Sequence, residues 1–236
     1  MKHLVFQLYG PMASWGEIAA GGSRTSDAHP SKSAVMGLLG AALGVRRDED
    51  DRHVQLSETF CIAIRVGNRG ELLRDYHTTE VPGPIKKQYY TRKQELHSDN
   101  LNTILSDRDY RVDAHYMIAM WQSSERAAFS LEELQEALQH PRFNLYLGRK
   151  SCPLALPLCP QIVEAESLSQ AFSQAHFPPL SMKDLPKSGL AEFMWEEHPE
   201  PGLEASMVYT RRDKVLSRKR WQFEDRREYY AAVQED

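Results

Sequence analysis

The first 45 residues constrain the fold most, because they place a strand, a glycine-rich loop and a helix in close succession. Residues 2–9 alternate in character, with Leu4, Phe6 and Leu8 sharing one face. Such alternation is the period-two pattern of a strand that buries one face and leaves the other half-exposed. The chain is therefore expected to begin inside a sheet and to turn back over it through the loop and the helix.

The helix is expected from about Ser33 to Leu43 and offers a place for an anion at its start. Its first N–H groups have no partner within the helix, and they lie next to Lys32. The glycine-lysine spacing of nucleotide-binding loops is missing, so an RNA phosphate is the expected ligand, contacted by Ser31, Lys32 and Ser33. The alternative is that a serine only caps the helix.

The remaining pattern predicts an α+β domain. Strands are expected at 60–66, 72–78 and 114–121, with the first two forming a hairpin, followed by a capped helix from Ser130 and a short extended stretch at 143–147. A strip of small residues between 37 and 44 is expected to pack on the sheet. The order strand, helix, strand, strand, helix, strand is that of a ferredoxin-like domain, which RNA-recognition modules share.

Residues 79–113 form an insertion that is too long for an ordinary connection. Its first half combines cations with aromatic rings and has no acid between 81 and 94. That combination suits single-stranded nucleic acid, because phosphates meet the charges and bases stack on the rings. A solvated lysine loop with two packing tyrosines is the alternative. The candidates are Lys86, Lys87, Tyr89, Tyr90, Arg92 and, in the second half, Arg108.

Other cations follow glycines or lie in loops of small residues. Arg149 and Lys150 come after Gly148 and are candidates for contact with a phosphate or a base edge, with a surface salt bridge as the alternative. Arg24 has the same two interpretations. Arg46 and Arg47 are RNA candidates too, although they could instead only stabilise the C-terminal end of the preceding helix.

Composition limits the class of protein. The 236 residues are 41% apolar, which supports a substantial core, and the net charge of −4 argues against a protein that coats nucleic acid indiscriminately. No run is long enough to span a membrane and no signal peptide is evident, so a cytoplasmic protein is expected. The three cysteines predict free thiols. The acidic, proline-rich part between 164 and 204 is expected to be irregular.

Four segments together resemble a known family. Residues 10–16, 30–44, 73–78 and 146–153 are similar in order and spacing to the CasD family, the RNA-binding subunits of type I-E Cascade complexes in the RAMP superfamily. The likeness covers residues 1 to about 160.

This resemblance implies a ferredoxin-like (RRM-like) palm over 1–160, interrupted by a thumb at 79–113, and an irregular, partly β C-terminal extension at 161–236. It implies a subunit that grips the 5′ handle of the CRISPR RNA and caps the backbone filament. The implied partners are the CRISPR RNA, the backbone subunit CasC, the large subunit CasA, other Cascade subunits and, indirectly, target DNA.

Tyr76 and His77 are the residues that could form an active site. A metal-independent endoribonuclease needs a base and an acid at one phosphodiester, and histidine and tyrosine suit these tasks. A base-contacting or hydrogen-bonding role is expected instead, so neither residue is expected to be catalytic. No spacing typical of a metal site or a cofactor site is present. A processing endoribonuclease and a pure protein adaptor remain the two alternatives to an RNA-binding scaffold.

Overall fold

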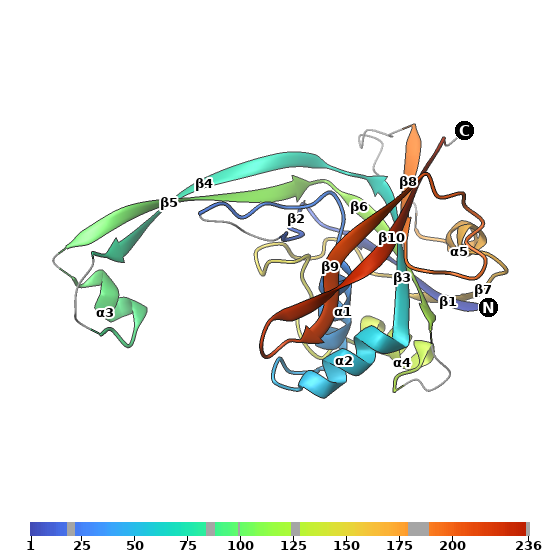
Figure 1. Ribbon diagram of the computed structural model, residues 1–236, viewed down its shortest axis with the longest axis horizontal. Coiled ribbons are helices and arrows are strands. Elements are labelled where there is room, and N and C mark those ends of the chain that lie inside the picture. Colours follow the sequence, from blue (N-terminus) through green and yellow to red (C-terminus); the bar gives the residue numbers. More distant parts are fainter. Residues whose placement is uncertain (18–21, 84–87, 99, 124–127, 179–188, 235–236) are drawn as a thin grey trace.

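The computed structural model describes residues 1–17, 22–83, 88–98, 100–123, 128–178 and 189–234. A seven-stranded sheet in the order β7-β1-β6-β3-β8-β10-β9 forms the body, and a three-stranded sheet in the order β2-β5-β4 projects from it (Figure 1). The strands are β1 (Lys2–Tyr9), β2 (Met12–Ala13), β3 (Phe60–Asn68), β4 (Glu71–Pro82), β5 (Leu101–Val112), β6 (His115–Gln122), β7 (Gln161–Glu164), β8 (Leu190–Trp195), β9 (Met207–Ser217) and β10 (Gln222–Gln234). The helices are α1 (Lys32–Leu43), α2 (Asp50–Thr59), α3 (Arg92–Leu96), α4 (Leu131–Gln139) and α5 (Leu168–Gln174). All strand pairs within the two sheets are antiparallel, so the molecule is a mixed fold of helices and mostly antiparallel sheets.

Strand β1 is buried on both faces. Leu4, Phe6 and Leu8 enter the main core together with α1 and α4, as the alternation predicted. On the other face, Val5 belongs to a second core under α5, and His3 is fully buried. The expected half-exposed strand is therefore wrong, because α5 and the segment after β8 cover the face that sequence alternation assigned to solvent.

Helix α1 begins and ends as its sequence predicts. The side chain of Ser31 accepts a hydrogen bond from the backbone N–H of Ala34, and Gly44 ends the helix with a φ of 76°, a left-handed conformation that favours glycine. The strip of small residues does not face the sheet. A side chain at Gly37 would meet Arg218, and one at Gly40 would meet His53, so the strip instead makes room for side chains from other elements.

The second expected strand does not pair with its predecessor. β3 lies in the main sheet between β6 and β8, whereas β4 leaves the body and pairs with β5 from Glu71–Val112 to Pro82–Leu101. The predicted hairpin of 60–66 and 72–78 is therefore wrong. The reason is that residues 101–112, which the sequence placed within the long insertion without a strand, form a strand of 12 residues that offers β4 a longer partner.

The end of the expected palm also differs. Helix α4 carries the predicted capping box between Ser130 and Glu133. The stretch 143–147 is a loop with a single β-bridge from Tyr146 to Pro153. The strand that follows α4 and pairs with the free edge of β1, opposite β6, is β7. Residues 141–160 are free of regular strands because they cross over the end of α1 and line a groove there.

The C-terminal part is more regular than its acidic, proline-rich composition predicts. β8 pairs with β3 and β10, and β10 pairs with β9, so residues from 190 onward extend the main sheet. Trp195 and Ala231 are buried in the second core. The main sheet is thus completed by residues distant in sequence, which local periodicity does not reveal.

A buried pair of histidines should make stability depend on pH. Nε2 of His3 lies 3.0 Å from Nε2 of His198. Burial, followed by the charges of His198 and the N-terminus, lowers the pKa of His3 to about 4 from its usual 6.5. The folded state therefore disfavours the protonated form, so the contribution of His3 to stability is full above pH 6.5 and is lost as the pH falls toward 4.

We expect His3→Gln to reduce the loss of unfolding free energy between pH 7.5 and pH 5, measured by urea denaturation at each pH. His140→Gln is the matched control, since the side chain of His140 is mostly exposed. An equal pH dependence in wild type and His3→Gln would contradict the assignment.

Candidate nucleic-acid interface

The start of α1 already binds anions that belong to the chain itself. The backbone N–H of Lys32 donates to the Asp213 carboxylate at 2.7 Å, and the Lys32 ammonium donates to Glu196 at 2.8 Å with both side chains buried. The N–H and the ammonium of Lys32, which were expected to meet a phosphate, thus contact carboxylates of the chain itself. Ser31 caps the helix, and its hydroxyl lies 3.0 Å from that of Ser33.

Asp213 and Glu196 belong to a buried network of charges centred on Arg226. The guanidinium of Arg226 donates to both carboxylate oxygens of Asp213 at 2.6 and 2.9 Å and to Glu228 at 2.6 Å, and it lies 3.5 Å from Glu196. Burial alone would raise the pKa of Asp213, but the hydrogen bonds and charge of Arg226, together with the Lys32 N–H and the charge of Arg211, outweigh burial and hold that pKa below its usual value. The network fixes the start of α1 to β9 and β10.

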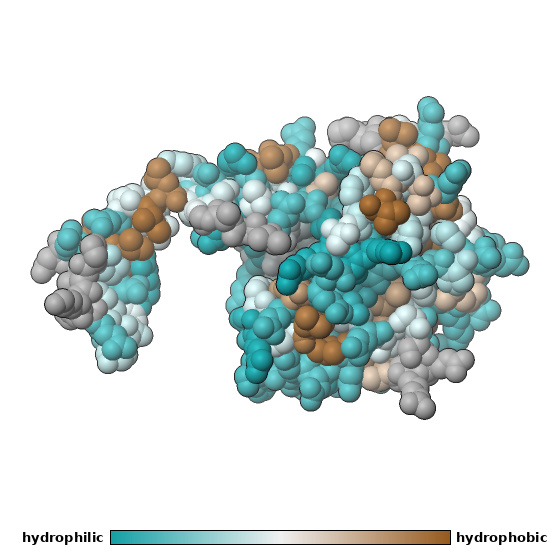
Figure 2. All heavy atoms as spheres, viewed as in Figure 1, coloured by the Kyte–Doolittle hydropathy of each residue, from teal (hydrophilic) through white to brown (hydrophobic). Residues whose placement is uncertain are grey.

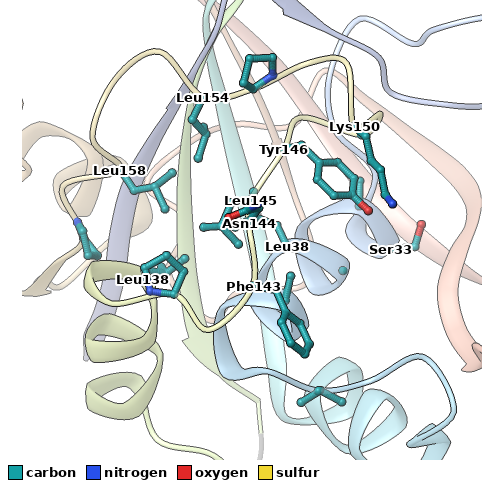
Figure 3. A pocket seen from close by; sticks show the side chains of 18 of the residues that line it. Ser33, Leu38, Leu138, Phe143, Asn144, Leu145, Tyr146, Lys150, Leu154 and Leu158 are labelled. Carbon is teal, nitrogen blue, oxygen red and sulfur yellow. The ribbon is translucent and has the colours of Figure 1, made fainter.

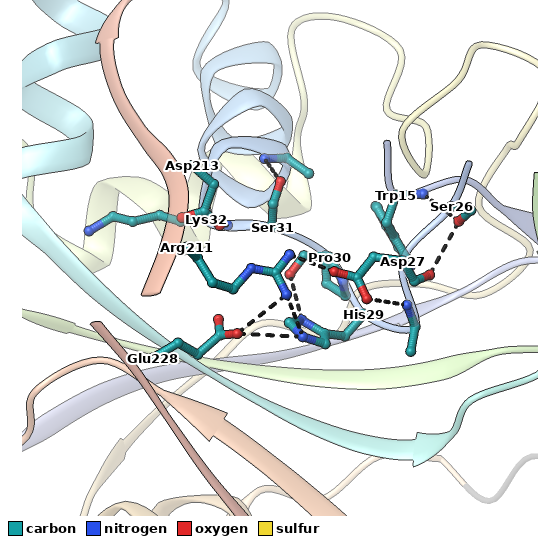
Figure 4. Close-up of polar contacts among 12 residues, drawn as sticks. Trp15, Ser26, Asp27, His29, Pro30, Ser31, Lys32, Arg211, Asp213 and Glu228 are labelled. Carbon is teal, nitrogen blue, oxygen red and sulfur yellow. Dashed lines mark hydrogen bonds and ion pairs between the residues drawn. The ribbon is translucent and has the colours of Figure 1, made fainter. Parts of the chain in front are cut away.

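The network continues through Arg211 to the loop before α1 (Figure 4). Arg211 forms an ion pair with Asp27 at 2.6 Å and lies 3.4 Å from Glu228, while one of its nitrogens is 2.9 Å from Nε2 of His29. Nδ1 of His29 lies 3.0 Å from the carbonyl of Pro30, to which it can donate. Burial lowers the pKa of His29, which fits a neutral ring that accepts from Arg211.

A groove of about 1,880 Å³ runs between α1 and the 141–160 segment (Figure 3). Its middle is apolar, with Leu38 of α1 facing the leucines and Phe143 of the crossing segment. Cations also line the groove, and five of the predicted residues are among its lining residues, namely Ser31, Ser33, Arg46, Arg47 and Lys150. No aspartate or glutamate lines it among the described residues. In a chain with a net charge of −4, such a surface selects an anionic ligand.

A second group of predicted residues lies where the hairpin leaves the body. The backbone of Arg24 forms an isolated parallel β-bridge with the backbone of Arg108 in β5. Arg149 donates to the carbonyls of Asp109 and Arg24 and lies over the ring of Tyr110 at 4.7 Å. Gly148 is required here because it has a φ of 86° and a side chain would overlap the Ser14 carbonyl. The backbone that approaches Gly148 closely is that of Ser14. Arg149 contacts the backbone at the base of the hairpin.

The third group lies on the hairpin and its tip. Tyr76 is exposed on β4, and Nδ1 of His77 lies 2.9 Å from the Asp75 carboxylate. Because neighbouring residues of a strand point to opposite faces, Tyr76 and His77 do not converge on one point. Apolar side chains also gather on this arm (Figure 2), and exposed hydrophobic residues there include Leu105.

At the tip, Arg92 of α3 pairs with Glu95 at 2.8 Å and donates to the Glu80 carbonyl. Tyr90 is exposed and Tyr89 is half-buried. Lys86 and Lys87 lie outside the described residues. The predicted residues are therefore distributed over a groove, a hairpin base and a tip rather than gathered in one site.

Sequence reasoning missed the residues that organise this interface. In the sequence, a charged stretch contains three of them, Asp213, Arg226 and Glu228. Their pairing with α1 joins strands that are more than 150 residues away in sequence. Arg218 and Trp221, at the turn between β9 and β10, also line the groove. The density of cations between 211 and 227 was the only signal for them.

Three further findings concern the described part of the chain. Among the described residues, no three His, Cys, Asp or Glu side chains are grouped so that they could hold a metal ion. The described chain also contains no helix that combines the length and the apolar character needed to cross a membrane. All three cysteines are free thiols.

Comparisons with known proteins agree on one family. A family model described as CRISPR-associated protein (Cas_Cas5) matches residues 3–228. The Escherichia coli (strain K12) protein named CRISPR system Cascade subunit CasD is 36% identical over 161 residues, which cover 66% of this chain and 69% of CasD. Among solved structures, a chain of a "CRISPR RNA-guided surveillance complex" aligns over 98% of this chain and 90% of its own length, with a TM-score of 0.68 and 24% identity. A "Crystal structure of Cas protein" aligns over 98% and 95%, with a TM-score of 0.63 and 26% identity.

We expect Arg226→Met to lower the free energy of unfolding by about 3–5 kcal/mol, because it leaves three buried carboxylates without their shared partner. Urea denaturation at pH 7 measures the change. Lys2→Met is the control, since it removes an exposed ion pair with Glu132 that is worth about 0–1 kcal/mol. A similar small loss in both variants would show that the network does not hold α1 to the C-terminal strands.

Proposed function

The chain belongs to the Cas5 family of CRISPR-associated proteins, and from this premise we propose that it is a CRISPR RNA-binding subunit of a Cascade-type surveillance complex. The observation that carries the proposal is the 36% identity with the Cascade subunit CasD. The acid-free groove beside α1 supports it, because a single-stranded RNA supplies the phosphates that such a surface selects.

Within that role, we propose that the chain grips the 5′ handle of the CRISPR RNA and caps the backbone filament. The body offers the cationic groove with Arg46, Arg47 and Lys150, and the hairpin offers exposed aromatic and apolar side chains beyond it. A two-part surface of this kind can hold a strand in the groove and separate its bases with the hairpin. Lys86, Lys87, Tyr89, Tyr90 and Arg92 are proposed to contact the RNA.

The architecture supports a ferredoxin-like palm. Strands β7-β1-β6-β3 are neighbours in that order, and α1 and α4 share the core on one of their faces. This is the arrangement that a ferredoxin-like domain requires of its four strands and two helices. The hairpin from β4 to β5 is then the thumb, and the residues after β7 are the extension that completes the sheet.

We propose the backbone subunit CasC and the large subunit CasA as neighbours within the complex, with other Cascade subunits as further partners and target DNA contacted indirectly. A subunit that caps a filament meets the filament on one side and a different protein on the other. Both sides need surfaces away from the groove. Exposed hydrophobic residues on β9, including Met207 and Val208, provide such a surface on the far part of the sheet.

We propose a non-catalytic role. Tyr76 and His77 occupy opposite faces of β4, so they cannot act as acid and base on the same phosphodiester in this conformation. His77 has the Asp75 carboxylate beside it, which suits a base contact or an ion pair. An endoribonuclease remains the alternative function.

The protein should leave repeat RNA intact. We expect no defined product after incubation of the purified chain, or of its complex, with repeat RNA in EDTA, read by denaturing gel electrophoresis. His77→Ala is the diagnostic variant, and His97→Ala, at the residue that caps the C-terminal end of α3, is the matched control. A product that disappears only in His77→Ala would establish the endoribonuclease and overturn the scaffold.

We expect the hairpin to contribute to RNA binding and not to the folding of the body. Thr79 pairs with Ile104, so residues 80–103 can be replaced by an Asn-Gly turn that leaves the register below it intact. The cut also spares the Arg74–Asp109 ion pair and buried Tyr110. We expect a cooperative thermal transition within about 5 °C of wild type, and poorer protection of the first guide nucleotides from nuclease in the assembled complex.

Two outcomes would count against this assignment. Loss of the cooperative transition would make the hairpin part of the core. Normal nuclease protection by the trimmed chain would remove the hairpin from the RNA surface.

A further inference from the structure

The turn between β9 and β10 presents an aromatic ring next to two arginines that line the groove. Trp221 is 57% exposed, whereas Trp15, Trp121 and Trp195 are each 3% exposed or less. The guanidinium carbons of Arg47 and Arg218 lie 4.9 and 5.4 Å from the centre of the Trp221 ring. An indole that attracts two cations and still faces solvent is a suitable surface for a nucleobase.

Within the described part of the chain, neither arginine has an acidic partner. Among the described residues, no carboxylate lies within ion-pair distance of either guanidinium, and the charge of Arg47 adds to burial in lowering the pKa of Arg218. The Arg218 guanidinium donates to the Ser33 carbonyl, and its Nε is buried without a hydrogen-bond partner. Two like charges held together without a counterion, one of them with a free donor, form a place for an anion.

The turn is held in this position by the body. The Asp50 carboxylate accepts hydrogen bonds from the Ser217 hydroxyl at 2.6 Å and from the backbone N–H groups of Arg218 and Lys219 at 2.5 and 3.2 Å. Gly37 leaves room for the Arg218 side chain against α1, where an added Cβ would lie 3.0 Å from its nitrogen. The carboxylate near this turn is therefore used to fix its backbone and does not neutralise its guanidinium.

The same groove places further RNA-compatible groups opposite the turn. Tyr146 and Lys150 extend from the crossing segment toward Ser33 at the start of α1 (Figure 3). Tyr146 is 38% exposed and lies close enough to Arg218 to influence its pKa. A phosphate beside the arginines, with its base on an aromatic face, would use all of these groups.

We propose that Trp221, Arg47 and Arg218 form a stacking site for one unpaired nucleotide of single-stranded RNA, with the base on the indole and the adjoining phosphate between the guanidiniums. The site rests on the proposed RNA-binding function and extends it to the C-terminal β9–β10 turn. An RNA occupant fits better than an acidic protein segment, because a π-face is required as well as negative charge.

The experiment uses the intrinsic fluorescence of the full chain, because Trp221 is the one strongly exposed tryptophan among the four. Acrylamide quenches exposed indoles, and we expect the quenchable emission to be lost in Trp221→Phe. Addition of the repeat-derived 5′ segment of the guide, as a synthetic single-stranded RNA, should protect Trp221 from acrylamide. Octauridylate should protect Trp221 too, because stacking tolerates any base. Inorganic phosphate at 10 mM should not protect it. Protection by phosphate about equal to that by RNA would show that the site binds anions without stacking a base, which would overturn the proposal.

Affinity gives an independent measurement. We expect Trp221→Ala to weaken binding of the same RNA about 5- to 150-fold, the equivalent of one lost base stack, and Trp221→Phe to restore most of the affinity. Arg47→Gln should lower the log–log salt slope by about 0.7. Tyr209→Ala is the matched control, since Tyr209 is an exposed aromatic residue on β9 that does not line the groove; it should bind RNA as wild type does.

The outcomes separate this site from the general function. If the wild type binds RNA, and Trp221→Ala binds equally well with no protection of Trp221, the stacking site is wrong and RNA binding stands. If Trp221 is protected only when the other subunits assemble, and not by RNA, the occupant is a protein and the proposal fails. If the wild type binds no RNA alone and no RNA co-purifies with its complex, the proposed function fails as well.

Discussion

The arrangement of the molecule depends on one buried cation, Arg226. Its guanidinium joins Asp213 of β9 to Glu228 of its own strand, and Asp213 in turn accepts the first free N–H of α1. Burying several charges is costly, and an apolar cluster of the same volume is often as stable. What the network adds is a geometric requirement, because each carboxylate must find its donor. Helix α1 is therefore held to strands from the far end of the chain in one position.

That position creates the groove. With the start of α1 fixed to β9 and β10, the β9–β10 turn lies against Gly37, and the 141–160 segment crosses the other side of the helix. Cations from three distant parts of the chain then share one surface: Arg47 after α1, Lys150 in the crossing segment and Arg218 in the turn. The acidic residues that offset these cations in the net charge make other contacts. Asp50, for example, binds the backbone of the turn and not its guanidinium. The net charge of the chain thus says little about its interface.

Sequence predicted the local elements well and their partners poorly. The caps of α1 and α4 and the strands near 2–9, 60–66 and 114–121 follow from side-chain chemistry within a few residues, and these are confirmed. The wrong hairpin arose because β4 was matched to the nearest strand, while its true partner begins at Leu101. Lys32 shows that the partners of a site are as hard to predict from local sequence as the partners of a strand. A cation beside free N–H groups predicts an anion correctly, but no local signal shows that Asp213 and Glu196 supply it from within the chain.

The hairpin and the groove are separate regions of the molecule, and contacts at the base of the hairpin connect them. The hairpin extends beyond the body with exposed side chains along both strands, so little packing restrains its far end (Figure 1). At its base, the Ser14 hydroxyl donates to the Asp109 carbonyl, the Arg74 guanidinium pairs with the Asp109 carboxylate, and Arg149 bonds to the same backbone. Arg149 directly follows Gly148, one of the residues that line the groove, so the crossing segment contacts both regions. An RNA strand in the proposed groove would therefore meet the hairpin at a base that these contacts hold to the body.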